Sequence, residues 1–219
     1  SVLDRCKVFL SVAHDEYWTD TMLTNGESAR NRGVSMAFLS GNALLHAVNL
    51  QPASASGQPN RVFNRDHYMR DTGRNLMGET TYGPGNGDWL VTQADHWIFE
   101  GTGLKDGDVL RNLVGWEYHG PPFAEIEGLE VVAMGEVHAF WSSGPGIFGA
   151  VVYPGPKNNW VFNAGTIYWS QALSEPPGHV PAASSEHRTL GVDARVQQIT
   201  HNFLQHCLED STLTFKGGR

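Results

Sequence analysis

Residues 7–43 read KVFLSVAHDEYWTDTMLTNGESARNRGVSMAFLSGNA, and the fold is decided within this stretch. It contains two short apolar runs, KVFLSVA at its start (residues 7–13) and VSMAFL near its end (residues 34–39). Runs of this length that contain β-branched residues and stop at polar residues are typical of buried parallel strands. The stretch therefore predicts two strands of one parallel sheet.

The segment between these two runs predicts a helix. Thr19 or Asp20 can cap its start, and Gly33 stands where a left-handed residue commonly ends a helix. The crossover of such a βαβ unit is right-handed, which places the two strands side by side and pointing the same way. HDEYW (residues 14–18) and SGNA (residues 40–43) then emerge at the carboxyl edge of the sheet, where open α/β sheets bind ligands.

The rest of the chain predicts hairpins and one further helix. Three strand-like runs, with Gly/Pro turns between them, favour antiparallel pairing: Leu129–Met134, Ile147–Tyr153 and Trp160–Ile167. Asp193 opens a closing helix whose apolar face consists of Val196, Ile199, Phe203, Cys207 and Leu208. Residues 51–60, 71–88 and 174–187 are rich in Gly, Pro, Ser, Thr or Asn and predict irregular loops.

The composition narrows the class of function. Lys plus Arg number 15 and Asp plus Glu number 23, giving a net charge of -8. This is the wrong sign for nucleic-acid phosphates or an anionic membrane surface, so we expect neither partner. Cys6 and Cys207 lie far apart in the sequence, which excludes a disulfide framework and a Cys-type zinc site. Their scarcity fits a reducing compartment, and we expect the chain in the cytoplasm.

The HDEYW segment concentrates ionisable and aromatic side chains in one strand-to-helix turn. Glu16 could act as a hard oxygen ligand or a general base, and His14 as a proton carrier. Asp15, Tyr17 and Trp18 could line a pocket beside them. The alternative is an ordinary acidic helix start, where carboxylates favour the helix dipole. From the pattern alone, both interpretations stay open.

Asn42 follows the second strand of the pair. Its amide can orient a carbonyl group or a water molecule, but it is not a nucleophile, and no G-x-S-x-G motif offers a serine instead. A turn asparagine that bonds its own backbone is the equally plain interpretation. Residues 66–68, 95–97 and 116–119 also hold possible ligands, but their spacing matches no metal motif and favours structural roles.

Four stretches of the chain carry a resemblance to a known family: SVAHDEYW, AFLSGNA, residues 95–120 and NWVFNAGTIYWSQAL (residues 159–173). Through them the chain resembles the C-terminal domain of the large (beta) subunit of N,N-dimethylformamidase and its relatives. The resemblance runs nearly end to end. It implies a class I glutamine amidotransferase-like, flavodoxin-like α/β fold: a parallel sheet with helices on both faces, here with an added antiparallel hairpin region. We expect residues 1–219 to form a single such domain, the C-terminal part of a longer protein.

The resemblance also implies roles for individual residues. Glu16 matches the carboxylate ligand of a mononuclear ferric iron, His14 a histidine beside the iron, and Asn42 an asparagine of the same pocket. In the family, two tyrosinate ligands precede the HDEYW segment, and residues 1–15 of this chain contain no Tyr. We therefore expect the remaining ligands from an upstream segment or another subunit, within an oligomer.

The function that this resemblance implies is iron-dependent hydrolysis of a small amide, similar to N,N-dimethylformamide, to an amine and a carboxylate. Glu16 would hold the metal, His14 would carry the proton from water to the leaving amine, and Asn42 would orient the substrate or the water. One alternative is a catalytically inactive amidotransferase-like domain that binds a partner or a carbohydrate. Another is a sugar-metabolising domain of the same fold.

Overall fold

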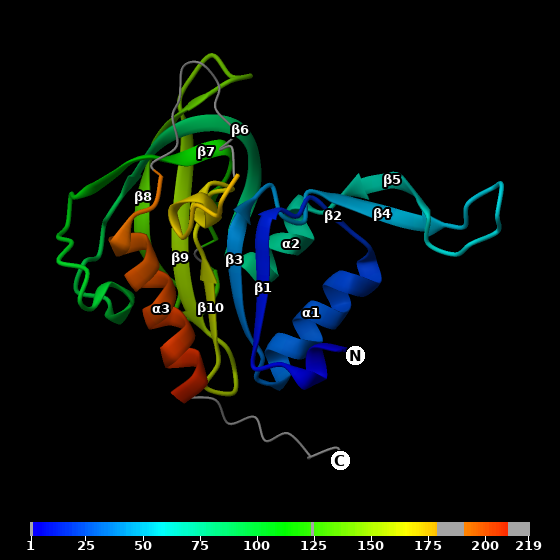
Figure 1. Cartoon of the computed structure of the whole chain (residues 1–219), viewed down its shortest axis with the longest axis horizontal. Helices are drawn as coiled ribbons and strands as arrows, with labels where there is room; N and C mark the ends of the chain where they lie inside the picture. The colour runs from blue at the N-terminus through cyan, green and yellow to red at the C-terminus, as the bar shows by residue number, and fades with distance from the viewer. Residues whose placement is uncertain (1, 124, 179–190, 210–219) are drawn as a thin grey trace.

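A computed structural model describes residues 2–123, 125–178 and 191–209 (Figure 1). Its α-helices are α1 (Asp20–Arg32), α2 (Arg70–Met77) and α3 (Ala194–Glu209), and its short 3-10 helices are η1 (Val2–Arg5), η2 (Trp97–Phe99) and η3 (Trp169–Ala172). The strands are β1 (Val8–His14), β2 (Tyr17–Trp18), β3 (Ser35–Gly41), β4 (His46–Gln51), β5 (Val62–Tyr68), β6 (Glu79–Leu90), β7 (Val109–Pro122), β8 (Glu130–Ala139), β9 (Gly146–Pro154) and β10 (Trp160–Asn163).

The predicted βαβ unit is confirmed. β1 and β3 pair in parallel, from Val8 opposite Ser35 to His14 opposite Gly41. Between them, α1 is capped by Thr19, whose side chain accepts a hydrogen bond from the Met22 N–H. Gly33 ends the helix with φ 110°, the left-handed conformation that glycine adopts without steric cost.

The main sheet is mixed, with seven strands in the order β1-β3-β10-β9-β8-β6-β7. Only β1, β3 and β10 pair in parallel, and the pairs from β10 to β7 are antiparallel. Short turns join β8, β9 and β10, and such turns permit antiparallel pairing only. The predicted hairpins are thus confirmed, but the predicted parallel, flavodoxin-like sheet fits only loosely: the fold is mixed α/β with a mostly antiparallel sheet and few helices.

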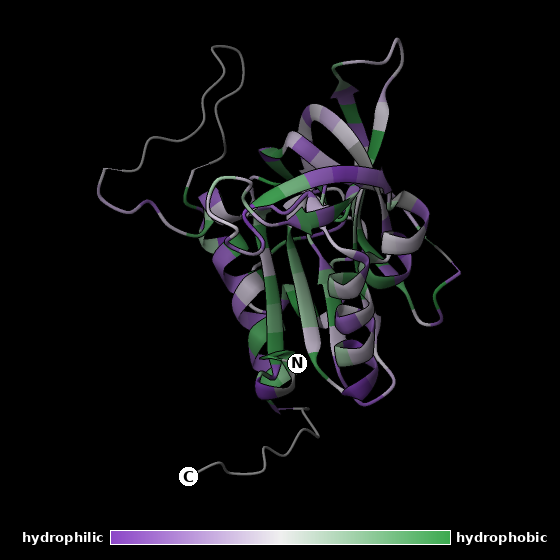
Figure 2. Cartoon of the chain, turned by 90° about the vertical axis from the view of Figure 1, so that its right-hand side faces the viewer, coloured by the Kyte–Doolittle hydropathy of each residue, from purple (hydrophilic) through white to green (hydrophobic). Residues whose placement is uncertain are grey.

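Helices pack on both faces of the parallel strands, as Figure 2 shows around the apolar strands at the centre. Alternate residues of β3 point to opposite faces. Met36 and Phe38 belong to the core cluster that includes residues of α1 and α2, whereas Ala37 and Leu39 belong to the cluster that includes α3. β3 is buried along its whole length, which explains its continuous apolar sequence.

The prediction that residues 71–88 form an irregular loop is wrong, because they contain most of α2 and β6. The glycines of β6 reflect close packing instead. A Cβ on Gly85 would lie 2.8 Å from the His138 carbonyl oxygen, and one on Gly87 would lie 2.6 Å from Val137 Cγ1. Residues 51–60 are the predicted loop, and they join β4 to β5 in a hairpin that projects from the body (Figure 1).

The closing helix α3 is confirmed. Asp193 caps it by accepting a hydrogen bond from the Arg195 N–H (2.8 Å). Four of the five predicted apolar residues are buried, and Leu208 is exposed instead. Both cysteines are free. The predicted loop at residues 174–187 lies outside the described residues from 179 onward. Among the described residues, none of the helices combines the length and apolar character that crossing a bilayer requires.

Candidate functional site

The ends of β1 and β3 bring the two predicted segments together. His14 is the last residue of β1 and lies opposite Gly41, the last residue of β3, so Glu16 and Asn42 follow at the same sheet edge. The turn after β3 is unusual, because Asn42 (φ 51°) and Leu44 (φ 55°) both adopt the left-handed conformation, which disfavours non-glycine residues. The sequence prediction that HDEYW and SGNA emerge side by side is confirmed.

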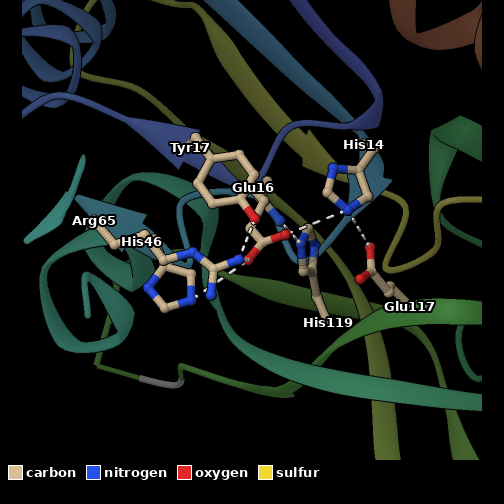
Figure 3. Close-up of polar contacts among 8 residues, drawn as sticks. His14, Glu16, Tyr17, His46, Arg65, Glu117 and His119 are labelled. Atoms are coloured by element: carbon tan, nitrogen blue, oxygen red, sulfur yellow. Dashed lines mark hydrogen bonds and ion pairs between the residues drawn. The ribbon is translucent and has the colours of Figure 1, made fainter. Parts of the chain in front are cut away.

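Glu16 forms the centre of the site (Figure 3). Its side chain is only 11% exposed, and three cationic or potentially cationic groups surround the carboxylate. His14 Nε2 lies 3.3 Å from Oε2, His46 Nε2 lies 3.4 Å from Oε1, and Arg65 Nη2 lies 4.0 Å from Oε1. A buried carboxylate with such neighbours keeps its charge at a lower free-energy cost than an isolated one.

Glu117, from the middle of β7, reaches the same place. His14 Nε2 lies 3.2 Å from Glu117 Oε2, so the imidazole bridges two carboxylates. Burial raises the pKa of Glu117, and His14 and a hydrogen bond from Asn42 partly offset that effect. Sequence reasoning favoured a structural role for residues 116–119 and missed Glu117. The available signal was an acidic residue in the apolar run VGWEYHG, since a charged residue in a buried strand needs a partner.

His119 lies two positions further along β7 and supports the turn after β3. It is fully buried, its Nε2 accepts a hydrogen bond from the Ala43 N–H (2.9 Å), and its Nδ1 lies 2.8 Å from Asn163 Oδ1. Burial lowers the pKa of His119 to about 4. The neutral ring with the proton on Nδ1 satisfies both bonds, because Nε2 must accept and Asn163 Oδ1 must accept.

An aromatic wall covers one side of Glu16. Tyr17 stacks on His46, with ring centroids 5.9 Å apart. On the Phe63 side, the ring centroids of Tyr17 and Phe63 of β5 lie 5.1 Å apart. The Tyr17 hydroxyl accepts a hydrogen bond from Arg65 Nη2 (2.5 Å), and the guanidinium lies over the Tyr17 ring. The β4–β5 hairpin therefore contributes one side of the site, which the sequence did not predict.

The structure separates Asp15 and Trp18 from this group. Asp15 accepts a hydrogen bond from Ser11 Oγ (2.6 Å), and burial raises its pKa. Trp18 is buried and packs edge-on against Phe9, with centroids 6.0 Å apart. Both residues, with His14, line a cavity of about 460 Å³ beside β1. They can form a neighbouring pocket, whereas Tyr17 lies with Glu16.

A family model described as N,N-dimethylformamidase beta subunit-like, C-terminal, matches residues 1–184. The chain belongs to this family. The matched range contains His14, Glu16, Asn42 and Glu117, and it ends before α3. A search among curated proteins found no match to the chain.

Iron is the metal that we expect from the sequence resemblance, and the donors at this site fit a hard cation. Among the His, Cys, Asp and Glu residues of the described chain, one group of three could hold a metal: His14, Glu16 and Glu117, whose ligand atoms lie within 4.8 Å of one another. Two carboxylates and an imidazole suit iron in either oxidation state. The hydroxyl of Tyr17, which follows Glu16 in the sequence, accepts a hydrogen bond from Arg65.

Proposed function

We propose that this chain is an amidohydrolase that uses a mononuclear ferric iron to hydrolyse a small linear amide, similar to N,N-dimethylformamide, to an amine and a carboxylate. The observation that carries this proposal is the convergence of His14, Glu16 and Glu117, with ligand atoms within 4.8 Å. Membership of the dimethylformamidase-like family supports the same chemistry. The residues that would hold the iron are Glu16 and Glu117, and His14 beside them would remain available to carry a proton.

The chemistry of amide hydrolysis suits these groups. An amide carbonyl is a poor electrophile, and bound iron supplies Lewis acidity that polarises the carbonyl and acidifies water. Hydrolysis forms a C–O bond from water, breaks the C–N bond, and needs one proton delivered to the leaving amine. His14 Nε2, between Glu16 and Glu117, would carry that proton, and burial, which raises the pKa of Glu117, favours proton exchange between the two groups. Asn42, next to Glu117, would orient the amide or the water.

We also propose that polypeptide outside this chain completes the site, either an upstream segment or another subunit of an oligomer. β1 is an edge strand of the main sheet (Figure 1), and its apolar residues Leu10 and Val12 are 44% and 45% exposed. An uncovered apolar edge next to His14 supports a neighbour at this position. The visible absorption of tyrosinate bound to ferric iron would identify the family's missing ligands, and its absence from the assembled, iron-loaded protein would contradict this part of the proposal.

The test of the proposed activity is amine release from N,N-dimethylformamide and small N-alkyl amides by the iron-loaded protein. We expect turnover that chelation abolishes and iron restores. Glu16→Gln should lower turnover by roughly three orders of magnitude or more, whereas the matched variant Glu136→Gln, which changes an exposed carboxylate of β8, should retain it. Full turnover without iron, or in Glu16→Gln, would refute the proposal.

The second candidate is a non-catalytic domain that binds a partner or a carbohydrate. It is favoured by one observation: His14 lies 3.3 Å from Glu16 and 3.2 Å from Glu117, so the two carboxylates already have a partner without a metal. This candidate predicts that the protein neither retains iron nor releases amine from any amide. Iron-dependent turnover would exclude it.

A further inference from the structure

Arg65 lies at the open side of the site, on the hairpin arm, by which we mean residues 46–68 with β4 and β5. Its side chain is 58% exposed, yet the guanidinium has a defined position. Nη2 donates to the Tyr17 hydroxyl and lies 4.0 Å from Glu16, and the group lies over the Tyr17 ring at 5.2 Å from its centroid. Stacking and hydrogen bonding restrict this guanidinium more than most exposed arginines.

The guanidinium still has free donors. Both polar contacts that Arg65 makes within the described residues use Nη2. Nη1 and Nε therefore keep N–H groups available on an exposed edge. A planar set of N–H donors in this arrangement matches a carboxylate, which it can bind through two parallel hydrogen bonds.

The hairpin arm is also locally basic in an acidic chain. It contains Arg61 and Arg65 but a single acidic residue, Asp66, whereas the whole chain has a net charge of -8. Asp66 is engaged by Asn49 Nδ2 (3.2 Å) and lies 3.5 Å from His67 Nδ1. Arg65 is thus a positive group beside the site whose exposed edge is not neutralised by a carboxylate on the arm.

We propose that Arg65 binds a carboxylate of the substrate, so that the chain prefers amides that carry an acidic group a short distance from the amide carbonyl. This inference rests on the proposed amide hydrolysis and names its substrate class. Glu16 lies between His14 on one side and Arg65 on the other. A ligand with its amide near His14 and Glu117 and its carboxylate at Arg65 therefore spans the Glu16 carboxylate.

The probes are three amides of similar size and different charge: succinamate (anionic), butyramide (neutral) and β-alaninamide (cationic). Binding to the whole protein is measured by NMR titration, and turnover is measured in parallel. We expect succinamate to bind at least about tenfold more tightly than butyramide, which is modest for a charge-assisted pair because Arg65 is solvent-exposed. Arg65→Gln should remove this preference and Arg65→Glu should transfer it to β-alaninamide.

Two controls separate recognition from folding. Arg61→Gln changes the other arginine of the arm, whose guanidinium contacts Gln58, and should keep the succinamate preference. Arg65→Lys keeps the charge without the planar donors and should keep a weaker preference. Equal affinities for succinamate and butyramide in the wild-type protein, or an unchanged preference in Arg65→Gln, would overturn the inference.

The outcomes also distinguish this inference from the proposed hydrolysis. If succinamate binds in an Arg65-dependent manner but no amide is turned over, recognition stands and hydrolysis fails. If amides are turned over with no preference for succinamate, hydrolysis stands and the role of Arg65 is overturned.

Discussion

The parallel strand ends and the interior of β7 contribute different things to the candidate site. His14, at the end of β1, has a side chain that is 46% exposed, whereas His119, within β7, is fully buried. Of the strand-end groups, His14 is open to solvent, whereas Glu16 is only 11% exposed. Groups on β7 meet the site from within the protein, where burial raises the pKa of Glu117 and lowers that of His119. The parallel strand ends thus supply His14 and Glu16, and β7 supplies the second carboxylate, Glu117, together with the buried His119.

The largest effect should come from removing the charge that β7 contributes. Glu117→Gln keeps the shape of the side chain but not its proton-exchange chemistry, so we expect kcat for amide hydrolysis to fall by about 10²–10⁴-fold. Steady-state kinetics of the iron-loaded protein would measure this, with Glu136→Gln as the control. If Glu117→Gln turned over amides as fast as the wild type, the strand ends alone would form the site and β7 would have no part in catalysis.

Replacing His119 and replacing His14 should have different effects on the stability of the protein. His119→Leu leaves the buried Ala43 N–H without its partner and removes one hydrogen bond from Asn163 Oδ1, and we expect the free energy of unfolding to fall by about 2–5 kcal/mol. His14→Leu removes the partner of Glu16 and Glu117, but the imidazole is half-exposed and solvent can replace part of its effect, so the loss should be smaller, about 1 kcal/mol. Urea denaturation compares the two variants, and similar losses would contradict the distinction between strand end and interior.

A substitution at Gly41 tests the close packing of β3 against β7 directly. A Cβ on Gly41 would lie 2.2 Å from the Glu117 carbonyl oxygen, so Gly41→Ala should destabilise the chain by about 1–3 kcal/mol. Gly144→Ala is the matched control, because nothing lies within 4 Å of its Cβ position. If Gly41→Ala were as stable as Gly144→Ala, the close approach of the two strands would be incorrect.

The smallest effect concerns Glu79, a carboxylate away from the His14–Glu16–Glu117 group. It is fully buried, and neither oxygen has a hydrogen-bond partner among the described residues. Burial raises its pKa well above 4.5, so the folded chain holds a proton that the unfolded chain releases. Stability should therefore fall as pH rises above the unfolded value toward the folded one.

Replacing Glu79 should remove that dependence. We expect Glu79→Met to stabilise the chain by about 1 kcal/mol at pH 8 and by less at pH 4. Urea denaturation at both pH values measures the difference. If Glu79→Met were less stable than the wild type at pH 8, the Glu79 carboxyl group would have a stabilising hydrogen-bond or ionic partner, which would contradict this prediction.

Local patterns in the sequence predict the part of the site that the βαβ unit forms, but not the part that β7 forms. The βαβ unit was predictable because apolar runs, Thr19 and Gly33 each act over a few residues. β7 was not, because Gly115 and Gly120 interrupt its apolar pattern and resemble loop residues. In the sheet order, β7 lies at the edge opposite β1.

The approach of β7 to the strand ends depends on long-range structure. The antiparallel strands curve back over the parallel ones (Figure 1), so that the His119 N–H reaches the Gly165 carbonyl and the Ile167 N–H reaches the Glu117 carbonyl. These contacts join residues about fifty positions apart, and no short motif encodes them. Sequence reasoning missed Glu117 and the arm residue Arg65 for this reason, whereas it predicted that the segments of His14, Glu16 and Asn42 lie together.

The most direct test of the account is the iron content of the chelator-washed, reloaded protein in the wild type, Glu16→Gln and Glu117→Gln. We expect near-stoichiometric iron in the wild type, a large loss in Glu16→Gln, and a measurable loss in Glu117→Gln, because carboxylates from both parts of the sheet would hold the metal. Wild-type protein that takes up no iron, or a Glu16→Gln variant that holds as much as the wild type, would contradict it.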